Sequence, residues 1–149
     1  MAEGPPDLVA INHDDYHAKY VGQLASGDQF FVTQPFVPAI RGVDSGREFL
    51  AVYIFHADGR FKEAIIDDLG TRETVDTEEA MRLYERRLRE LGSVTYGDIE
   101  VVPFAIERFG VEFGLIPRPP EEEGDDWWVI LLPGDYMAFS EPFDGDYDT

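Results

Sequence analysis

The sequence predicts an α+β domain, in which a mostly antiparallel β-sheet of hairpins carries one main α-helix on one face. Apolar runs of strand length recur along the whole chain and are separated by short turn signals. Only one stretch has a helical period, and strands and helices do not alternate as parallel βαβ units would require. Because 149 residues is an ordinary domain length and no linker or repeat divides the chain, we expect a single domain over 1–149.

The first half of the chain predicts two hairpins after an irregular arm over residues 1–15. Residues 25–28 and the pair Asp58-Gly59 are the turn signals. Unbroken apolar residues over 30–32 and 49–55 indicate strands that are covered on both faces of the sheet. The expected strands are 16–24, 29–36, 48–56 and 60–68.

The main helix is expected at about residues 77–91. Asp76 followed three residues later by Glu79 is a capping-box pattern, and Gly92 suits the position after the last turn. An apolar stripe at helical spacing indicates the face that packs on the sheet, and it consists of Met81, Tyr84, Leu88 and Leu91.

The last third of the chain predicts shorter strands and a frayed end. Pro103 interrupts one strand pattern, which favours an edge position or a bulge, and Pro117 ends the next strand pattern. The acidic tail over residues 144–149 is expected to be frayed. The expected strands are 98–106, 111–116, 127–132 and 136–139.

The charge of the chain is large and uneven. There are 31 Asp and Glu against 12 Lys and Arg, a net charge of -19. The ten carboxylates that follow Arg118 are accompanied by no Lys, Arg or His. Such a chain has no general attraction for nucleic acid or for an anionic membrane surface, so neither is expected as a partner.

Composition and the absence of known motifs exclude several classes of protein. The absence of cysteine excludes disulfides and thiolate metal sites. The first residues resemble no signal peptide, and no apolar run approaches the roughly 20 residues that span a bilayer. Neither a nucleophile elbow nor a phosphate-binding loop occurs. We therefore expect a cytoplasmic protein without a cofactor and without an identifiable catalytic residue.

The acidic C-terminal third interleaves carboxylates with aromatic residues, a pattern typical of a protein-binding surface. Aromatic side chains supply the buried centre of an interface, and surrounding carboxylates steer a basic partner toward it. Trp128 and Phe139 are expected in the core instead. The predicted partner-binding residues are Glu121, Glu122, Glu123, Asp125, Asp126, Trp127, Asp135, Tyr136, Glu141, Phe143, Asp144, Asp146 and Tyr147.

These features predict a small acidic binding or inhibitor protein that engages a basic protein partner without catalysis. In character alone, and through no shared motif, the profile resembles that of bacterial immunity proteins, which neutralise cationic toxin domains. The sequence does not predict an oligomeric state.

Two alternatives remain open. A small hydrolase that depends on carboxylates or a metal would use pairs such as Asp67-Asp68, and His13 with His17 has the spacing of a zinc pair on a helix. Alternatively, the acidity reflects a high-salt cytoplasm and says nothing about function.

The helix carries the main basic concentration of the chain, at Arg82, Arg86, Arg87 and Arg89. We expect these side chains to neutralise carboxylates of the same domain, with the acidic loop over 121–126 as a candidate.

Overall fold

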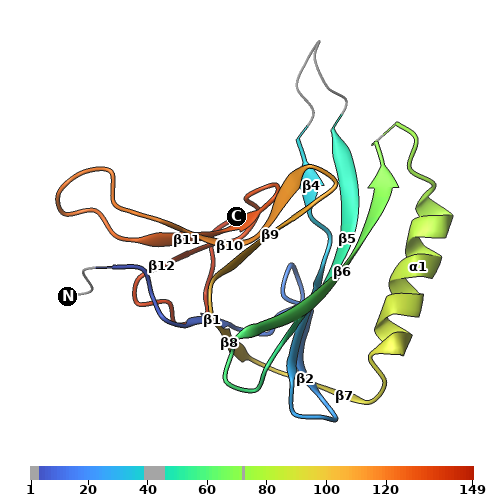
Figure 1. The fold of residues 1–149 in the computed structure, drawn as a ribbon, viewed down its shortest axis with the longest axis horizontal. Coiled ribbons are helices and arrows are strands. Elements are labelled where there is room, and N and C mark those ends of the chain that lie inside the picture. The colour runs from blue at the N-terminus through green and yellow to red at the C-terminus, as the bar shows by residue number, and fades with distance from the viewer. Residues whose placement is uncertain (1–3, 39–45, 72) are drawn as a thin grey trace.

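The computed structural model describes residues 4–38, 46–71 and 73–149, which form one α-helix and twelve β-strands (Figure 1). Residues 1–3 of the predicted arm lie outside the described residues. The strands are β1 (Val9–Ile11), β2 (Tyr20–Leu24), β3 (Gln29–Thr33), β4 (Phe36–Val37), β5 (Arg47–Phe55), β6 (Phe61–Gly70), β7 (Val94–Tyr96), β8 (Ile99–Val101), β9 (Phe104–Arg108), β10 (Val111–Arg118), β11 (Trp128–Leu132) and β12 (Ala138–Ser140), and the helix is α1 (Thr77–Glu90).

The strands form three antiparallel sheets, which confirms the predicted α+β class. In the first sheet β5 pairs with β6 on one edge and with β3 and β4 on the other, and the order continues through β2 to β7. The second sheet has the order β12-β11-β10-β9, and β1 pairs with β8 as a separate ribbon. Hairpin turns connect β2 to β3, β5 to β6 and β11 to β12, where the turn signals predicted them.

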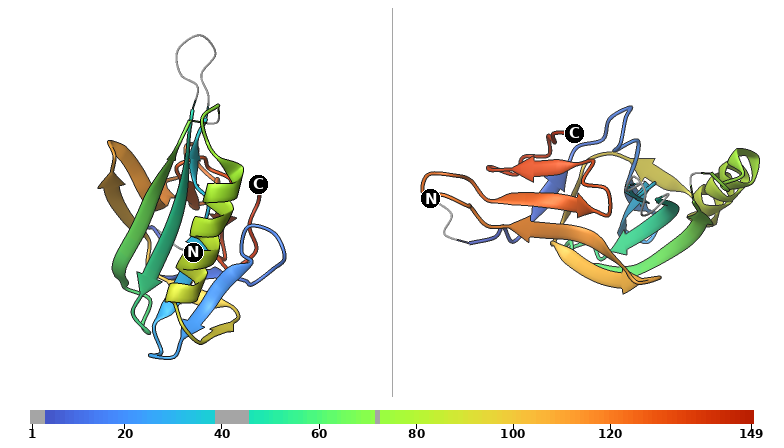
Figure 2. Two further views of the ribbon diagram at one scale, coloured as in Figure 1. Left: turned by 90° about the vertical axis from the view of Figure 1, so that its right-hand side faces the viewer. Right: turned by 90° about the horizontal axis from the view of Figure 1, so that it is seen from above.

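The first sheet is apolar on both faces, as the runs over 30–32 and 49–55 predicted. Phe30, Leu50 and Val52 face α1, whereas Phe31, Phe49 and the residues that alternate with them face the second sheet. Figure 2 shows α1 lying across the first sheet, with the second sheet on the opposite side. The layers are therefore helix, sheet, sheet, and the four-stranded sheet is the layer that the sequence did not predict.

The helix begins and ends where its signals predicted. The Asp76 carboxylate accepts hydrogen bonds from the amides of Glu78 and Glu79 at 3.0 and 3.1 Å, and Gly92 has a φ of 76° after the last turn. The packed stripe is shorter than predicted. Met81 is 58% exposed, and the sheet-facing contacts come from Leu83, Tyr84, Leu88 and Leu91.

An ion pair fastens α1 to the first sheet. Arg87 donates from Nε and Nη2 to the two carboxylate oxygens of Asp67 on β6, at 2.8 Å each, and from Nη1 to Glu90 at 2.7 Å. The side chains of Arg87 and Asp67 are only 16% and 21% exposed. The arginine most buried on the helix thus neutralises a sheet carboxylate. The loop over 121–126 lies at the opposite end of the molecule from α1 (Figure 1), so that part of the prediction was wrong.

Several strand boundaries differ from prediction for local reasons. Residues 16–19 form a turn rather than the start of β2, because Asp14 caps this segment with its side chain. Pro35 separates β3 from β4. Pro117 lies within β10 and pairs with Val129, although it was expected to end the strand. The short strands β1, β4 and β7 have too few residues to show a period.

The C-terminal tail is paired rather than frayed. The backbone groups of Asp148 and Ala138 exchange hydrogen bonds of 2.8 and 2.9 Å, and on the other side Asn12 donates its amide to the Gly145 carbonyl at 3.1 Å. Gly145 has a φ of 111°, and a Cβ there would lie 2.2 Å from the Asn12 side chain. The tail and the predicted arm therefore hold each other in place.

We expect the substitution Arg87→Met to lower the free energy of unfolding by about 1–3 kcal/mol, because it leaves the partly buried Asp67 carboxylate without its partner. Urea unfolding followed by circular dichroism measures this change. The matched control is Arg86→Met, whose exposed pair with Glu90 spans 3.5 Å and contributes about 0.5 kcal/mol or less. Equal losses in the two variants would contradict the assigned role of the pair.

Candidate functional site

The outer face of the second sheet combines apolar side chains with the acidic loop between β10 and β11. Alternation along β11 turns Val129 and Leu131 into the core, where both are fully buried, and leaves Trp128 and Ile130 half-buried on the opposite face. Arg118 and Ile116 of β10 pair with these two residues. The side chain that was expected in the core, Trp128, thus belongs to the outer face, whereas Phe139 is in the core as predicted.

A cleft of about 820 Å³ lies between this face and the loop. Its apolar wall is formed by Trp128, Ile130 and the two prolines that begin the loop. Carboxylates from two turns converge on it, and among the described residues Arg118 is the only basic one of the lining. The acidic residues that line the cleft are Glu121, Asp125, Asp126 and Asp135.

The loop is held by its own side chains. Asp125 accepts a hydrogen bond from the Glu122 amide at 3.2 Å, and Glu141 accepts one from the Trp127 amide at 3.2 Å. Glu122 and Glu123 are exposed but do not line the cleft. Asp135 occupies the turn after β11 with a left-handed φ of 47°. We call the cleft, with Trp128 and its four acidic residues, the acidic surface.

The other predicted partner-binding residues lie elsewhere. Tyr136 is buried, and its hydroxyl bonds to Thr33 at 2.5 Å. Phe143 packs against the core. Asp146 accepts a hydrogen bond from Asn12 at 3.3 Å, and Tyr147 packs on His17 with a ring-centroid distance of 6.1 Å. The exposed Asp144 lies on the same tail. The single surface predicted from the sequence is therefore divided between the loop and the tail.

The tail positions a loop over residues 14–18. The Asp14 carboxylate accepts hydrogen bonds from the amides of Tyr16 and Ala18 at 2.8 and 3.0 Å, and from the Tyr147 hydroxyl at 2.6 Å. The Tyr147 hydroxyl in turn accepts from the His17 amide at 3.1 Å. Partial burial alone would raise the pKa of Asp14, but these hydrogen bonds outweigh it and hold the pKa below its ordinary value of 3.8. Burial and the bond to Asp14 raise the pKa of Tyr147 to about 12.

This network predicts an acid-sensitive contribution to stability. Because the pKa of Asp14 is lower in the folded state, its contribution is present above pH 3.8 and is lost as the pH falls through the folded-state pKa. We expect Asp14→Asn to lower the free energy of unfolding by about 1–2 kcal/mol at pH 7. The difference from the unmodified protein should shrink as the pH falls below 3.8.

Urea unfolding between pH 3 and pH 7 checks this expectation. Asp15→Asn is the matched control, since it removes the neighbouring exposed carboxylate and should leave stability nearly unchanged. A deficit of Asp14→Asn that stays constant over this pH range would contradict the assignment.

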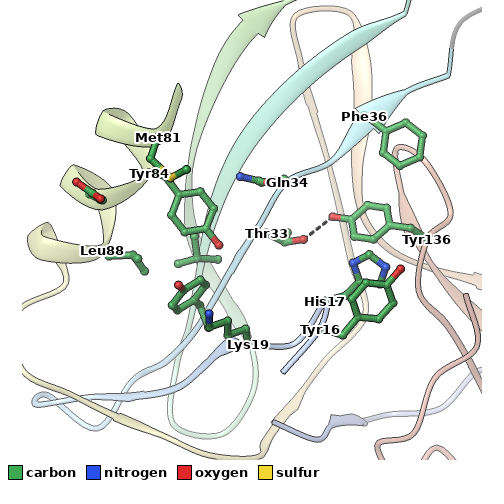
Figure 3. A pocket seen from close by; sticks show the side chains of 13 residues that line it. Tyr16, His17, Lys19, Thr33, Gln34, Phe36, Met81, Tyr84, Leu88 and Tyr136 are labelled. Carbon is green, nitrogen blue, oxygen red and sulfur yellow. Dashed lines mark hydrogen bonds between the residues drawn. The ribbon is translucent and has the colours of Figure 1, made fainter. Parts of the chain in front are cut away.

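A second cleft, of about 480 Å³, lies where α1, the first sheet and the 14–18 loop meet (Figure 3). Tyr84 and Met81 project from the helix on one side, and Tyr16, His17 and Tyr136 lie on the other. The sequence analysis missed this cleft because its residues come from four separated segments. The sequence did contain one signal, the tyrosine Tyr84 in the apolar stripe of the helix. Tyr84 was assigned only to the core.

We call this second cleft the tyrosine cleft. Its tyrosines are uncharged, and its positive and negative side chains balance each other in charge. Burial raises the pKa of Tyr136 and of Tyr84, so both remain neutral phenols. Burial lowers the pKa of His17, and the charge of Asp14 offsets only part of that effect. Within the part of the chain that the structure describes, the lining has one ammonium, that of Lys19, and one carboxylate, that of Glu85.

The residues considered for metal binding or hydrolysis have other partners. The His13 ring stacks on Tyr96 at 5.9 Å, whereas the His17 ring packs on Tyr136 at 5.0 Å, and neither residue is on a helix. Asp67 pairs with Arg87, and Asp68 pairs with Arg47 at 2.6 Å.

Within residues 4–38, 46–71 and 73–149, no group of three or more His, Asp or Glu is arranged to hold a metal ion. In the same part of the chain, α1 is too short and too polar to cross a membrane.

Comparison of the chain with known protein families, curated proteins and solved structures finds no match.

Proposed function

We propose that this protein is a cytoplasmic binding protein whose acidic surface engages a basic protein partner without catalysis. The observation that carries the proposal is the placement of Trp128 and Ile130 in a cleft with four carboxylates and one basic residue. An aromatic side chain in a partly enclosed site is the usual anchor of an interface, and the charged rim gives orientation and speed of association.

The charges elsewhere on the molecule support this assignment by contrast. Several carboxylates on the first sheet and its turns are paired with nearby cations, as in Asp28 with Lys62 at 2.8 Å and Asp68 with Arg47 at 2.6 Å. Among the described residues, no ion pair involves a carboxylate of the loop over 121–126. The negative potential is therefore concentrated where the apolar face is open, which favours a cationic partner over uniform adaptation to salt.

The anchor of this surface is Trp128 rather than Trp127. The Trp127 amide bonds to Glu141 and fixes the end of the loop, while Trp128 faces the cleft. A basic segment with an apolar side chain would bury that side chain on Trp128 and Ile130, with its cations toward Glu121, Asp125 and Asp126.

Affinity capture from the native lysate at 50 mM and 500 mM salt tests the proposal. We expect the tagged protein to retain a basic protein at low salt and to release it at high salt. Two variants should abolish retention, namely Trp128→Ala and the triple variant Glu121→Gln, Asp125→Asn and Asp126→Asn. The first removes the anchor and the second removes the steering charge.

The matched control removes three exposed carboxylates elsewhere, through Asp7→Asn, Glu63→Gln and Glu73→Gln. It has the same net charge as the triple loop variant and should retain the partner. Failure to retain any basic protein, or equal retention by the loop variant and the control, would refute the proposal.

A further inference from the structure

The tyrosine cleft carries an inference that does not depend on the acidic surface. It lies between α1 and the first sheet, on the side away from the loop over 121–126, and shares no lining residue with the acidic surface. Its volume of about 480 Å³ is within the usual range for small-molecule sites, which are mostly apolar with a few polar groups.

Two aromatic groups face each other across this cleft. On the helix side Tyr20 and Tyr84 lie 5.3 Å apart with an interplanar angle of 62°, so the two rings meet edge to face and form a corner. On the other side His17 lies between Tyr16 and Tyr136, at 3.8 and 5.0 Å. Tyr16 is 67% exposed at the rim, where its ring packs on His17.

A cation already occupies one ring face of the cleft. The Lys19 ammonium lies 5.5 Å from the centroid of the Tyr20 ring, within the range of a cation–π interaction. Lys19 is exposed and long, so it can leave this ring at little cost. The side chain thus shows which chemistry the ring accepts, and it occupies the position that a ligand cation would take.

The charge of the molecule selects the sign of the ligand. A net charge of -19 repels anions and concentrates cations at the surface. Glu85 places a carboxylate in the lining, and the raised pKa of Tyr84 keeps its ring a neutral phenol. The apolar side chains of the lining, which include Met81 and Leu88, suit an apolar body.

We propose that the tyrosine cleft binds a small organic cation, a quaternary ammonium group that carries an apolar body. The ammonium packs on the faces of Tyr20 and Tyr84 near Glu85 and displaces Lys19, and the apolar body extends across the cleft toward Tyr16. Methylated ammonium groups suit such a corner because they have no N–H donors to satisfy and interact well with ring faces.

Titration of the isotope-labelled protein with choline, followed by NMR of the tyrosine rings, tests the proposal. The uncharged isostere 3,3-dimethylbutan-1-ol has the same shape and should bind about tenfold more weakly or not at all. Benzyltrimethylammonium should bind more tightly than tetramethylammonium because it adds an apolar body. Phenylacetate, which carries the opposite charge, should not bind.

Substitution of Lys19 gives the decisive variant, because it is expected to increase the affinity for choline. Lys19→Met frees the Tyr20 ring and removes a competing cation, so choline should bind about three- to tenfold more tightly. Lys62→Met is the matched control: it removes the only other lysine, which pairs with Asp28 far from these rings, and should change the affinity by less than about twofold. An increase in choline affinity cannot be explained by misfolding, because a misfolded variant would bind choline more weakly.

Loss variants complete the test. Tyr84→Leu should weaken choline binding about tenfold, and Tyr16→Ala, at an exposed position, should weaken benzyltrimethylammonium without affecting the fold. Tryptophan emission should not change, since both tryptophans lie at the acidic surface end of β11. The proposal is wrong if the neutral isostere binds as well as choline, if phenylacetate binds, or if Lys19→Met weakens choline binding.

Discussion

Burial of the first sheet on both faces is the constraint on which the rest of the structure depends. Strands β3 and β5 are apolar on each side, so a layer must cover each side before the sheet is stable in water. The helix covers one side through Tyr84, Leu88 and Leu91, and the second sheet covers the other through Phe113 and Leu131. Both clefts arise at the limits of these layers. The tyrosine cleft lies at the margin of the helix, and the acidic surface lies on the outer face of the second sheet, where Trp128 and Ile130 are half-buried.

The distribution of charge follows the same division. Cations join elements of the fold, as Arg87 joins α1 to Asp67 of the first sheet and Lys62 joins β6 to Asp28 in the turn between β2 and β3. Among the described residues, the carboxylates of the loop over 121–126 take part in none of these ion pairs. The acidity is therefore a local property of one surface as well as a property of the whole chain. This is the arrangement expected of a protein that attracts a cationic partner to one place.

Periodicity and turn chemistry were sufficient to predict the helix, the hairpins and the two-sided burial of 49–55, because these depend on neighbours in the sequence. The second sheet as a separate layer was not predictable in this way, since its position depends on which face of the first sheet remains uncovered. The acidic residues of the loop were found from composition, but Trp127 was predicted among the partner-binding residues and Trp128 was expected in the core. Only the register of β10 with β11 shows that Trp128 faces outward. Tyr136 and Tyr147 were grouped with the loop by sequence proximity, whereas long-range hydrogen bonds with Thr33 and Asp14 place them elsewhere.

The most direct test of the central claim uses the position of the two tryptophans, which are consecutive in the chain and lie at the acidic surface. Stopped-flow mixing with the captured basic partner, followed by tryptophan emission, measures association at that surface alone. The account predicts a change in emission on binding and an association rate that falls about tenfold or more between 50 and 500 mM salt, with little change in the dissociation rate. Binding without a change in tryptophan emission, or an association rate independent of salt, would contradict it.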